Sequence, residues 1–394
     1  MISSELKNNM NNSSWIRRMF EEGVKLRQEF GAENVFDFSL GNPELAPPKS
    51  VTDTLKKIVN NENVEIHRYM NNAGFGDVRQ KVADSINKTT VKPLTTNHII
   101  MACGAAGGLN VCMKTLLNPG EEVIIFAPYF AEYIFYISNF GGKAVIIPTD
   151  KDTFQPDLNE LEKHITANTK AIIINSPNNP SGVVYSEDIL KKMADLVETK
   201  EKEFNTSIFV LSDEPYTKII YDNVNIPNVL NIFKNSMVVN SFSKSLGIPG
   251  ERIGYIAVNS KIEDVDQLIN GLVFTTRTLG YVNSPALFQK VIADSLEDCI
   301  DVNEYKKRRD LLYTYLTDLG FSCVKPQGAF YLFPKALIED DVEFVLKAKE
   351  FNLLLVPGSG FGWKGHFRIS YCVDMSTIEN SLGAFAKLAE YYKK

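Results

Sequence analysis

The sequence predicts an α/β fold in which a large domain, built on a mostly parallel central sheet flanked by helices, is joined to a smaller α+β domain. From about residue 98, short runs of branched apolar residues alternate with helical segments. These runs are apolar at consecutive positions, as in parallel strands that are buried on both faces. After about residue 285 a long charged helical segment and shorter strands follow, which is typical of an α+β domain.

The elements of the large domain alternate in the order strand, loop, helix. Apolar runs predict strands at residues 98–102, 122–126, 144–147, 171–175, 208–211 and 237–240. Helices are predicted at residues 51–59, 77–86, 107–117, 130–139 and 157–165. Because parallel strands are joined by crossover helices, this alternation predicts a sheet that is covered on both sides.

Both ends of the chain are expected to build the smaller domain. Apolar residues at helical spacing predict an amphipathic helix over 15–30, and the polar stretch before it predicts an irregular lead-in. Further elements are predicted as strands at 36–40, 330–333, 353–356 and 367–371 and helices at 294–319 and 341–350. The expected domain parts are residues 1–48 (N-terminal part of the small domain), 49–285 (large domain) and 286–394 (C-terminal small domain).

Composition argues against several classes of partner. The chain has 394 residues, 44% of them hydrophobic, and a formal net charge of -6, whereas a nucleic-acid-binding protein usually has a basic excess. No apolar run reaches membrane-spanning length, and the N-terminus lacks the apolar core of a secretion signal. Five cysteines without a CxxC pattern indicate free thiols in a reducing cytoplasm, and four histidines without ligand spacing argue against a metal site.

Five loops that follow predicted strands carry the residues that are candidates for binding and catalysis. They read CGAAGG (103–108), APYFAEY (127–133), NSPNNPSG (175–182), SDEPY (212–216) and SFSKS (241–245). Open α/β sheets bind ligands beyond the carboxyl ends of their strands. The residue types of these loops are therefore expected to meet around one ligand.

One end of that ligand is predicted to be an anion. The stretch from Gly104 to Gly107 opens a helix, where backbone N–H groups suit a phosphate. Ser241, Ser243 and Arg252 add hydroxyl and guanidinium donors to the same anion.

The remaining residue types suit an aromatic aldehyde. Phe130 or Tyr129 offers a stacking surface, and Asp213 a partner for a protonated ring nitrogen. Asn179 and Tyr216 offer hydrogen bonds to a ring oxygen, and Lys244 an amine that forms a Schiff base with an aldehyde. Phosphate, ring nitrogen, ring oxygen and aldehyde together describe pyridoxal 5'-phosphate.

With these motifs the chain resembles the fold-type I pyridoxal-phosphate enzymes, specifically the class I/II aminotransferases of the aspartate aminotransferase family. The matching segments follow the order of that family over roughly residues 35–375. They are GNPE (41–44), Tyr69 with Gly74–Arg79, GAAGG (104–108), PYFAEY (128–133), NNPSG (178–182), DEPY (213–216), SFSK (241–244) with Arg252, GAFY (328–331) and FRIS (367–370).

The resemblance implies a catalytic role for three residues. Lys244 is similar to the lysine that forms the Schiff base and, once freed, moves the proton of the substrate Cα as general base and acid. Asp213 is similar to the carboxylate that pairs with the ring nitrogen, and Tyr216, with Asn179, to the pair that binds the ring oxygen.

The resemblance also implies binding roles. The residues implied to bind the cofactor are Ala105, Ala106, Phe130, Ser241, Ser243 and Arg252, the first two through their backbone N–H groups. Tyr69 resembles a tyrosine that reaches the phosphate of the neighbouring subunit, so a homodimer is expected. Arg368 resembles the arginine that binds the substrate α-carboxylate, with Gly41 and Asn179 beside it. The chain departs from many relatives in having alanines at 105 and 106, where a hydroxyl or amide side chain is common.

An amino acid:2-oxo acid aminotransferase of aspartate/aromatic-type or broad specificity is therefore the leading hypothesis. A carbon–sulfur β-lyase that uses the same lysine is the alternative, and a ligand-sensing domain of the same fold is a third. The aromatic segments 129–137 and 361–363 suit an apolar or aromatic substrate, whereas Arg277 suits aspartate or glutamate. The sequence leaves the choice of amino acid open.

Overall fold

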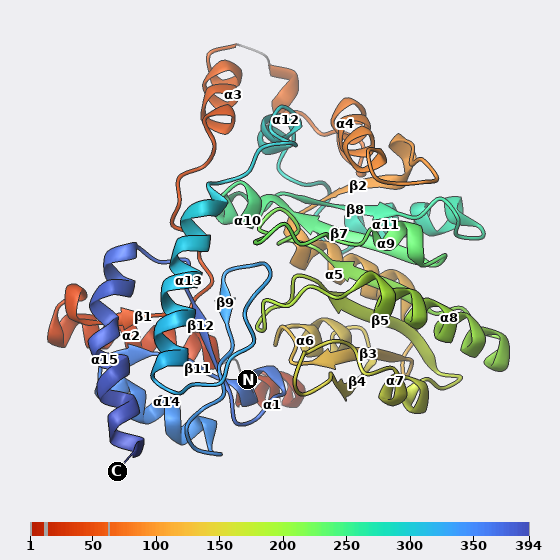
Figure 1. Ribbon diagram of the computed structural model, residues 1–394. Helices are drawn as coiled ribbons and strands as arrows, with labels where there is room; N and C mark the ends of the chain where they lie inside the picture. Colours follow the sequence, from red (N-terminus) through yellow and green to blue (C-terminus); the bar gives the residue numbers. More distant parts are fainter. Residues whose placement is uncertain (1, 12–14, 62–63, 394) are drawn as a thin grey trace.

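The computed structural model describes residues 2–11, 15–61 and 64–393. Within these residues the largest sheet has seven strands in the order β2-β8-β7-β6-β5-β3-β4 (Figure 1). The bounds of its strands are β2 (Ile99–Ala102), β3 (Glu122–Ala127), β4 (Lys143–Pro148), β5 (Thr169–Asn175), β6 (Phe209–Asp213), β7 (Ser236–Ser241) and β8 (Gly254–Val258).

Parallel pairing dominates this sheet, and the predicted fold class is confirmed. Strands β4, β3, β5, β6 and β7 pair in parallel, while β8 pairs antiparallel with both β7 and β2. The predicted strands recur within about two residues at each end. Strand β8 was not among them. An antiparallel strand needs no crossover helix, so β8 lacks the helical spacer that marked the other strands.

Helices cover both faces of the sheet. The helices of this part of the chain are α3 (Lys49–Val59), α4 (Gly76–Asn87), α5 (Gly104–Leu116), α6 (Tyr133–Ser138), α7 (Leu158–His164), α8 (Glu187–Phe204), α9 (Val229–Ile232), α10 (Phe242–Ser245), α11 (Val265–Thr278) and α12 (Ala286–Ala293). Alternate residues of β3 show the two faces. Val123 and Ile125 pack with α5 and α11, whereas Ile124 packs with α7 and α8. This two-sided burial explains the continuous apolar runs in the sequence.

A second group of elements comes from both ends of the chain. It contains α1 (Ser4–Asn11), α2 (Trp15–Phe30), β1 (Phe36–Asp37), β9 (Tyr331–Leu332), β10 (Leu353–Leu354), β11 (Val356–Pro357), β12 (Phe367–Ser370), α13 (Val302–Asp318), α14 (Asp341–Glu350) and α15 (Met375–Lys393). Strand β1 pairs with β10, which joins the N-terminal segment to the C-terminal one. In Figure 1 helices α13, α14 and α15 lie together to the left of the large sheet. The division at residues 48 and 285 stays a prediction.

Two predicted segments differ from the observed ones, and one helix of the predicted C-terminal part packs elsewhere. The helix predicted over 294–319 begins only at Val302, where the Asp301 side chain accepts a hydrogen bond from the N–H of Asn303 and caps α13. Helix α12 packs against α3 and α4 rather than with α13 to α15. The N-terminal lead-in predicted as irregular contains the helix Ser4–Asn11, while residues 12–14 lie outside the described residues.

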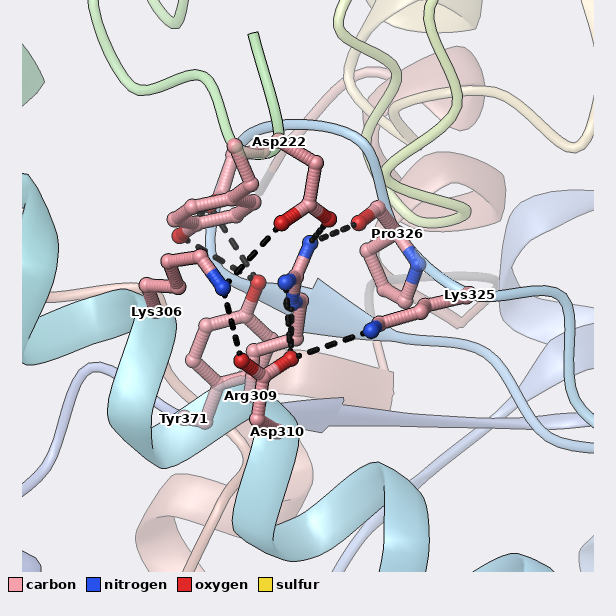
Figure 2. A network of polar contacts seen from close by, with 9 residues as sticks. Asp222, Lys306, Arg309, Asp310, Lys325, Pro326 and Tyr371 are labelled. Carbon is pink, nitrogen blue, oxygen red and sulfur yellow. Dashed lines mark hydrogen bonds and ion pairs between the residues drawn. The ribbon is translucent and has the colours of Figure 1, made fainter. Parts of the chain in front are cut away.

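A buried arginine connects α13 to two loops. Figure 2 shows the guanidinium of Arg309 between the carboxylates of Asp222 and Asp310. Its Nη1 donates to Asp222 Oδ2 at 2.7 Å and to the carbonyl of Pro326 at 2.8 Å, and its Nη2 lies 2.7 Å from Asp310 Oδ1. Lys306 also bridges the two carboxylates. This network ties the loop after β6 and the segment before β9 to one helix.

Among the described residues, no helix combines the length and the apolar character needed to cross a membrane. In the same part of the chain, no group of three or more histidine, cysteine, aspartate or glutamate residues is arranged to hold a metal ion.

Candidate active site

The carboxyl ends of the parallel strands converge on a pocket of about 160 Å³. Most of the site residues expected from the sequence lie around it. Its lining consists of Ala105, Ala106, Leu109, Phe130, Tyr136, Asn175, Asn179, Asp213, Pro215, Tyr216, Ser241, Ser243, Lys244, Pro249 and Arg252. Loops more than a hundred residues apart in sequence thus meet at one sheet edge, as the strand-end argument predicts.

Lys244 lies in the short helix α10, directly after β7. Its Nζ donates a hydrogen bond to the carbonyl of Gly41 at 2.6 Å and lies 5.6 Å from the centre of the Phe330 ring. Burial lowers the pKa of Lys244 to about 8, and the charges of Arg368 and Arg252 act in the same direction. About a tenth of this amine is therefore neutral, and nucleophilic, at pH 7, far more than for an ordinary lysine.

Asp213 ends β6 and has one oxygen without a partner. Tyr133 donates a hydrogen bond of 2.5 Å to Oδ2, whereas the buried Oδ1 has no hydrogen-bond partner among the described residues. Burial raises the pKa of Asp213 to about 6, although the hydrogen bond from Tyr133 opposes the shift. A buried acceptor without a donor is costly. A protonated ring nitrogen in the pocket would supply that donor, so the site fits the pyridine ring of the expected cofactor.

Two asparagines connect β5 to this aspartate. The register of the sheet pairs Asn175 with Asp213, and the side-chain amide of Asn175 donates to the Asp213 carbonyl at 2.9 Å. The Oδ1 of Asn175 accepts a hydrogen bond of 2.7 Å from the backbone N–H of Asn179. This pair fixes the backbone from which Asn179 projects into the pocket.

Arg368 lies on β12 and is almost fully buried. Its Nη1 donates to Asn179 Oδ1 at 3.1 Å and its Nη2 to the carbonyl of Ser39, while Nε has no partner among the residues that the structure describes. The rings of Tyr331 and Phe361 lie on the guanidinium, each with its centre at 4.8 Å. A buried guanidinium with a free N–H is suited to bind a carboxylate.

The predicted phosphate-binding residues surround the first turn of α5. Its first residue, Gly104, has φ of +70°, and a side chain there would lie 2.6 Å from Nη2 of Arg252. Glycine therefore allows the guanidinium to approach the helix N-terminus. Arg252 Nη1 donates to the carbonyl of Pro249 at 2.9 Å, and the Ser241 hydroxyl accepts from the N–H of Ser243 at 3.3 Å. Positive charge and backbone donors thus meet at one end of the pocket.

The structure distinguishes the two aromatic residues that the sequence offered for stacking. Phe130 lines the pocket and meets the Tyr133 ring edge-on, at 5.6 Å and 82°. Tyr129 is buried elsewhere, against Gly362, where an added side chain would come within 2.5 Å of its ring.

Four predicted residues do not line the pocket. Gly41 and Arg368 contact Lys244 and Asn179, which do line it. Tyr69 and Arg277 lie apart from it. Tyr69 is 92% exposed and does not line it. Arg277 is exposed at the end of α11 and lies over the ring of Phe274, 5.3 Å from its centre. Neither residue forms part of the pocket within one chain.

Three further residues contact the site but had no predicted role. Tyr133 donates to Asp213, Asn175 supports Asn179, and the Tyr331 hydroxyl lies 2.9 Å from that of Tyr216. Tyr133 and Tyr331 each end a motif of the resemblance, PYFAEY and GAFY, so their position was visible in the sequence. Their contacts were not, because these depend on how distant segments pack.

Comparisons with known proteins agree with this geometry. The family model described as aminotransferase class I and II matches residues 33–385. A probable aspartate aminotransferase of Methanocaldococcus jannaschii is 32% identical, over 99% of this chain and 100% of that protein. An aromatic-amino-acid aminotransferase 2 of Thermococcus litoralis is 30% identical, over 98% and 97%. The crystal structure of an amino transferase from Eubacterium rectale has a TM-score of 0.96 and 42% identity, over 100% of both chains.

Proposed function

The chain belongs to the class I and II aminotransferases, and from this membership we propose how its residues transfer an amino group between an L-amino acid and a 2-oxo acid. Family members of this kind act with pyridoxal 5'-phosphate. When bound, this cofactor supplies an aldehyde that takes up the amino group and a ring that withdraws electrons from the substrate Cα. The relatives favour amino transfer over the β-lyase alternative.

The observation that carries the proposed roles is the buried Oδ1 of Asp213, which lies at the Lys244 pocket without a donor among the described residues. We assign this oxygen to the ring nitrogen, whose proton the carboxylate holds in place. Tyr133 would keep the carboxylate oriented through its hydrogen bond to Oδ2. Asn179 and Tyr216 would hydrogen-bond the ring oxygen, and Phe130 would stack on the ring.

The anionic end of the cofactor would lie at the start of α5. Ser241, Ser243 and Arg252 would donate to the phosphate through their side chains, and the backbones of Ala105 and Ala106 through their N–H groups. The alanines at these two positions leave the side-chain contribution to the serines and the arginine.

Lys244 would act as the general base and acid. Its Nζ takes the proton from the substrate Cα, which requires the neutral amine, and the lowered pKa of about 8 supplies that form near neutral pH. Arg368 would bind the α-carboxylate through its unpartnered Nε, with Asn179 and the backbone at Gly41 beside it. The carboxylate then fixes the Cα relative to the amine.

The proposed substrate range is the aspartate/aromatic type, with apolar and aromatic amino acids favoured. Among the described residues, the cations that line the pocket are Lys244 and Arg252, and Arg368 bonds to Asn179 of the lining; each of the three already has a proposed partner. A second carboxylate would need a cation from elsewhere, such as Arg277 of a partner subunit. Phe130 and Tyr136, which line the pocket, instead offer apolar surface.

A homodimer and a cytoplasmic location complete the proposal. The resemblance of Tyr69 to a tyrosine that reaches the neighbouring subunit supports the dimer, and its 92% exposed ring is accessible for such a contact. The five cysteines are all unpaired, as is usual in a reducing compartment.

The absorbance spectrum of the purified protein tests the proposed function. Single amino acids added without an acceptor should convert the band of the aldehyde form into that of the amine form and release the matching 2-oxo acid. Phenylalanine and tyrosine should react faster than aspartate. Lys244→Ala should keep the fold, checked by circular dichroism, and lose turnover by at least about a thousandfold, as expected when an essential base is removed.

Three results would contradict the proposal. Pyruvate and ammonia released from a cysteine conjugate, without amine-form cofactor, would indicate the lyase. Absence of a cofactor band after reconstitution with pyridoxal phosphate would overturn the whole assignment. Turnover that persists in Lys244→Ala would remove that lysine from its role.

A further inference from the structure

Tyr331 lies between Tyr216, which is proposed to bind the ring oxygen, and Arg368, which is proposed to bind the α-carboxylate. It is 2% exposed and lies on β9, in the segment that the Arg309 network holds through Pro326. Just before it, the Ala329 carbonyl accepts a hydrogen bond of 2.5 Å from Tyr221. The backbone that carries Tyr331 is therefore held at two points, and its side chain has little freedom to move.

The hydroxyl and the ring of Tyr331 contact different parts of the site. The hydroxyl lies 2.9 Å from that of Tyr216 and packs directly on Gly41, where an added side-chain carbon would be 2.2 Å from the oxygen. The centre of the ring lies 4.8 Å from the guanidinium carbon of Arg368, the same distance as that of Phe361. One side chain thus contacts both the residue proposed for the ring oxygen and the residue proposed for the α-carboxylate.

The chemistry of the two hydroxyls gives their hydrogen bond a direction. A phenol has one proton to donate. If Tyr216 donates its proton to the ring oxygen of the cofactor, the hydrogen bond between the phenols has to be donated by Tyr331. A hydroxyl that accepts a hydrogen bond is a stronger donor itself. Tyr331 would then strengthen the contact from Tyr216 and stabilise the deprotonated ring oxygen.

The ring acts on Arg368 in a separate way. The guanidinium lies within cation–π distance of the Tyr331 ring as well as of the Phe361 ring, an attractive arrangement for a cation that restrains its position. With Nη1 and Nη2 bonded to Asn179 and Ser39, this leaves Nε in a fixed direction. The ring would therefore affect substrate carboxylate binding without touching the reacting atoms.

We propose that Tyr331 is a positioning residue with two separable contributions, its hydroxyl through Tyr216 and its ring through Arg368. This inference rests on the proposed function. It predicts that removal of the hydroxyl changes kcat and the titration of the bound cofactor, whereas removal of the ring also raises KM for the amino acid.

The test compares Tyr331→Phe with Tyr331→Leu in the holoenzyme. Tyr331→Phe should lower kcat about fivefold, the effect of one neutral hydrogen bond. It should leave KM within about twofold and move the absorbance titration of the bound cofactor to higher pH. Tyr331→Leu should show the same changes and raise KM about tenfold, in the range of one cation–π contact. Tyr185→Phe is the control, since it removes another buried hydroxyl on the far side of the sheet.

The titration separates positioning from a merely structural role. An unchanged titration midpoint in Tyr331→Phe, or a KM that rises as much as in Tyr331→Leu, would overturn the proposal. Should Tyr331→Leu not fold, Tyr331→Met tests the ring, because methionine adapts to core space. A wild-type enzyme that shows the cofactor band and turnover while these variants behave like Tyr185→Phe would refute this inference alone. A wild-type enzyme without either would refute the proposed function.

Discussion

At the scale of the residue, the site depends on buried polar groups that lack a hydrogen-bond partner among the described residues. Asp213 has an acceptor without a donor, and Arg368 a donor without an acceptor, among the described residues. Burying such groups costs free energy. A ligand with an N–H at one end and a carboxylate at the other would satisfy both. The protein therefore holds its substrate site in a form that is completed by binding.

The altered pKa of Lys244 leads to a prediction about reactivity. Its charged form is disfavoured by burial, so the proton should leave at about pH 8 instead of about 10.4 for an ordinary lysine. In the cofactor-free protein, acylation of Lys244 by a trace of acetic anhydride should rise with pH around a midpoint near 8. Peptide mass spectrometry measures the extent of Lys244 acylation at each pH, with the free ε-amine of Nα-acetyl-lysine as the internal reference. A midpoint above pH 10 would show that burial does not activate this amine.

At the scale of the element, strand ends and helix starts decide which residues meet. Strands β5, β6 and β7 point the same way, so Asn175, Asp213 and Ser241 lie at one edge of the sheet. The short helix α10 then turns Lys244 toward the pocket. Because the loops that follow these strands lie at one edge of the sheet, each loop contributes one group to the same site, and their order in the sequence indicates that site.

The Arg309 network allows a prediction about stability. The side chain is fully buried, so Arg309→Leu would leave the Pro326 carbonyl without its donor and the two carboxylates with only the lysines Lys306 and Lys325. Removal of one partner of a buried ion pair costs about 3 kcal/mol, and somewhat less here because Asp222 and Asp310 reach solvent. Urea unfolding measures it. Lys306→Ala, at the exposed edge of the network, should cost much less, because ion pairs in contact with solvent contribute little to stability.

The acid limb of the stability curve checks the electrostatic part of this prediction. Arg309, as a hydrogen-bond partner, holds the pKa of Asp222 well below its usual range. A carboxyl whose pKa is lowered in the folded state stabilises the protein at pH values above its ordinary pKa of about 3.9. This stabilisation is lost as the pH falls below that value. Arg309→Leu should therefore lose less stability than wild type between pH 4 and 2. Equal losses in both proteins would contradict the ion-pair role.

At the scale of the whole molecule, the site forms where the two groups of elements meet. Lys244 contacts Gly41, Asn179 contacts Arg368, and Tyr216 contacts Tyr331. Each pair joins the large sheet to a segment that comes from one end of the chain. A relative movement of the two groups would change all three contacts together, which offers a means of excluding water once the substrate is bound.

Assembly provides a prediction at this scale. Light scattering should give twice the chain mass, and Tyr69→Phe should weaken pyridoxal phosphate binding about fivefold without dissociating the dimer. A mixed dimer of Tyr69→Phe and Lys244→Ala subunits distinguishes the origin of the tyrosine. If Tyr69 reaches across the interface, the subunit with the intact lysine receives a normal tyrosine and binds the cofactor with wild-type affinity. Weakened affinity in that mixed dimer would place Tyr69 in its own subunit's site.

Much of this was determined by the sequence alone, for a physical reason. Parallel strands buried on both faces appear in the sequence as apolar runs, and the loops that follow them share one edge. The sequence therefore predicts that Lys244, Asp213 and Asn179 meet, as they do around the pocket. The same motifs identified the family. Domain boundaries and the dimer stay predictions, because they depend on surfaces rather than on local patterns.

Only the tertiary structure decided which side chains contact one another. It selected Phe130 over Tyr129 at the pocket, revealed Tyr133 on Asp213, and brought Tyr331 between Tyr216 and Arg368. Tyr133 is 80 residues from Asp213, and Asn179 is 189 from Arg368. Spacing along the chain carries no information about such contacts. They depend on how buried side chains fill the space between elements, and that is settled only when the whole chain packs.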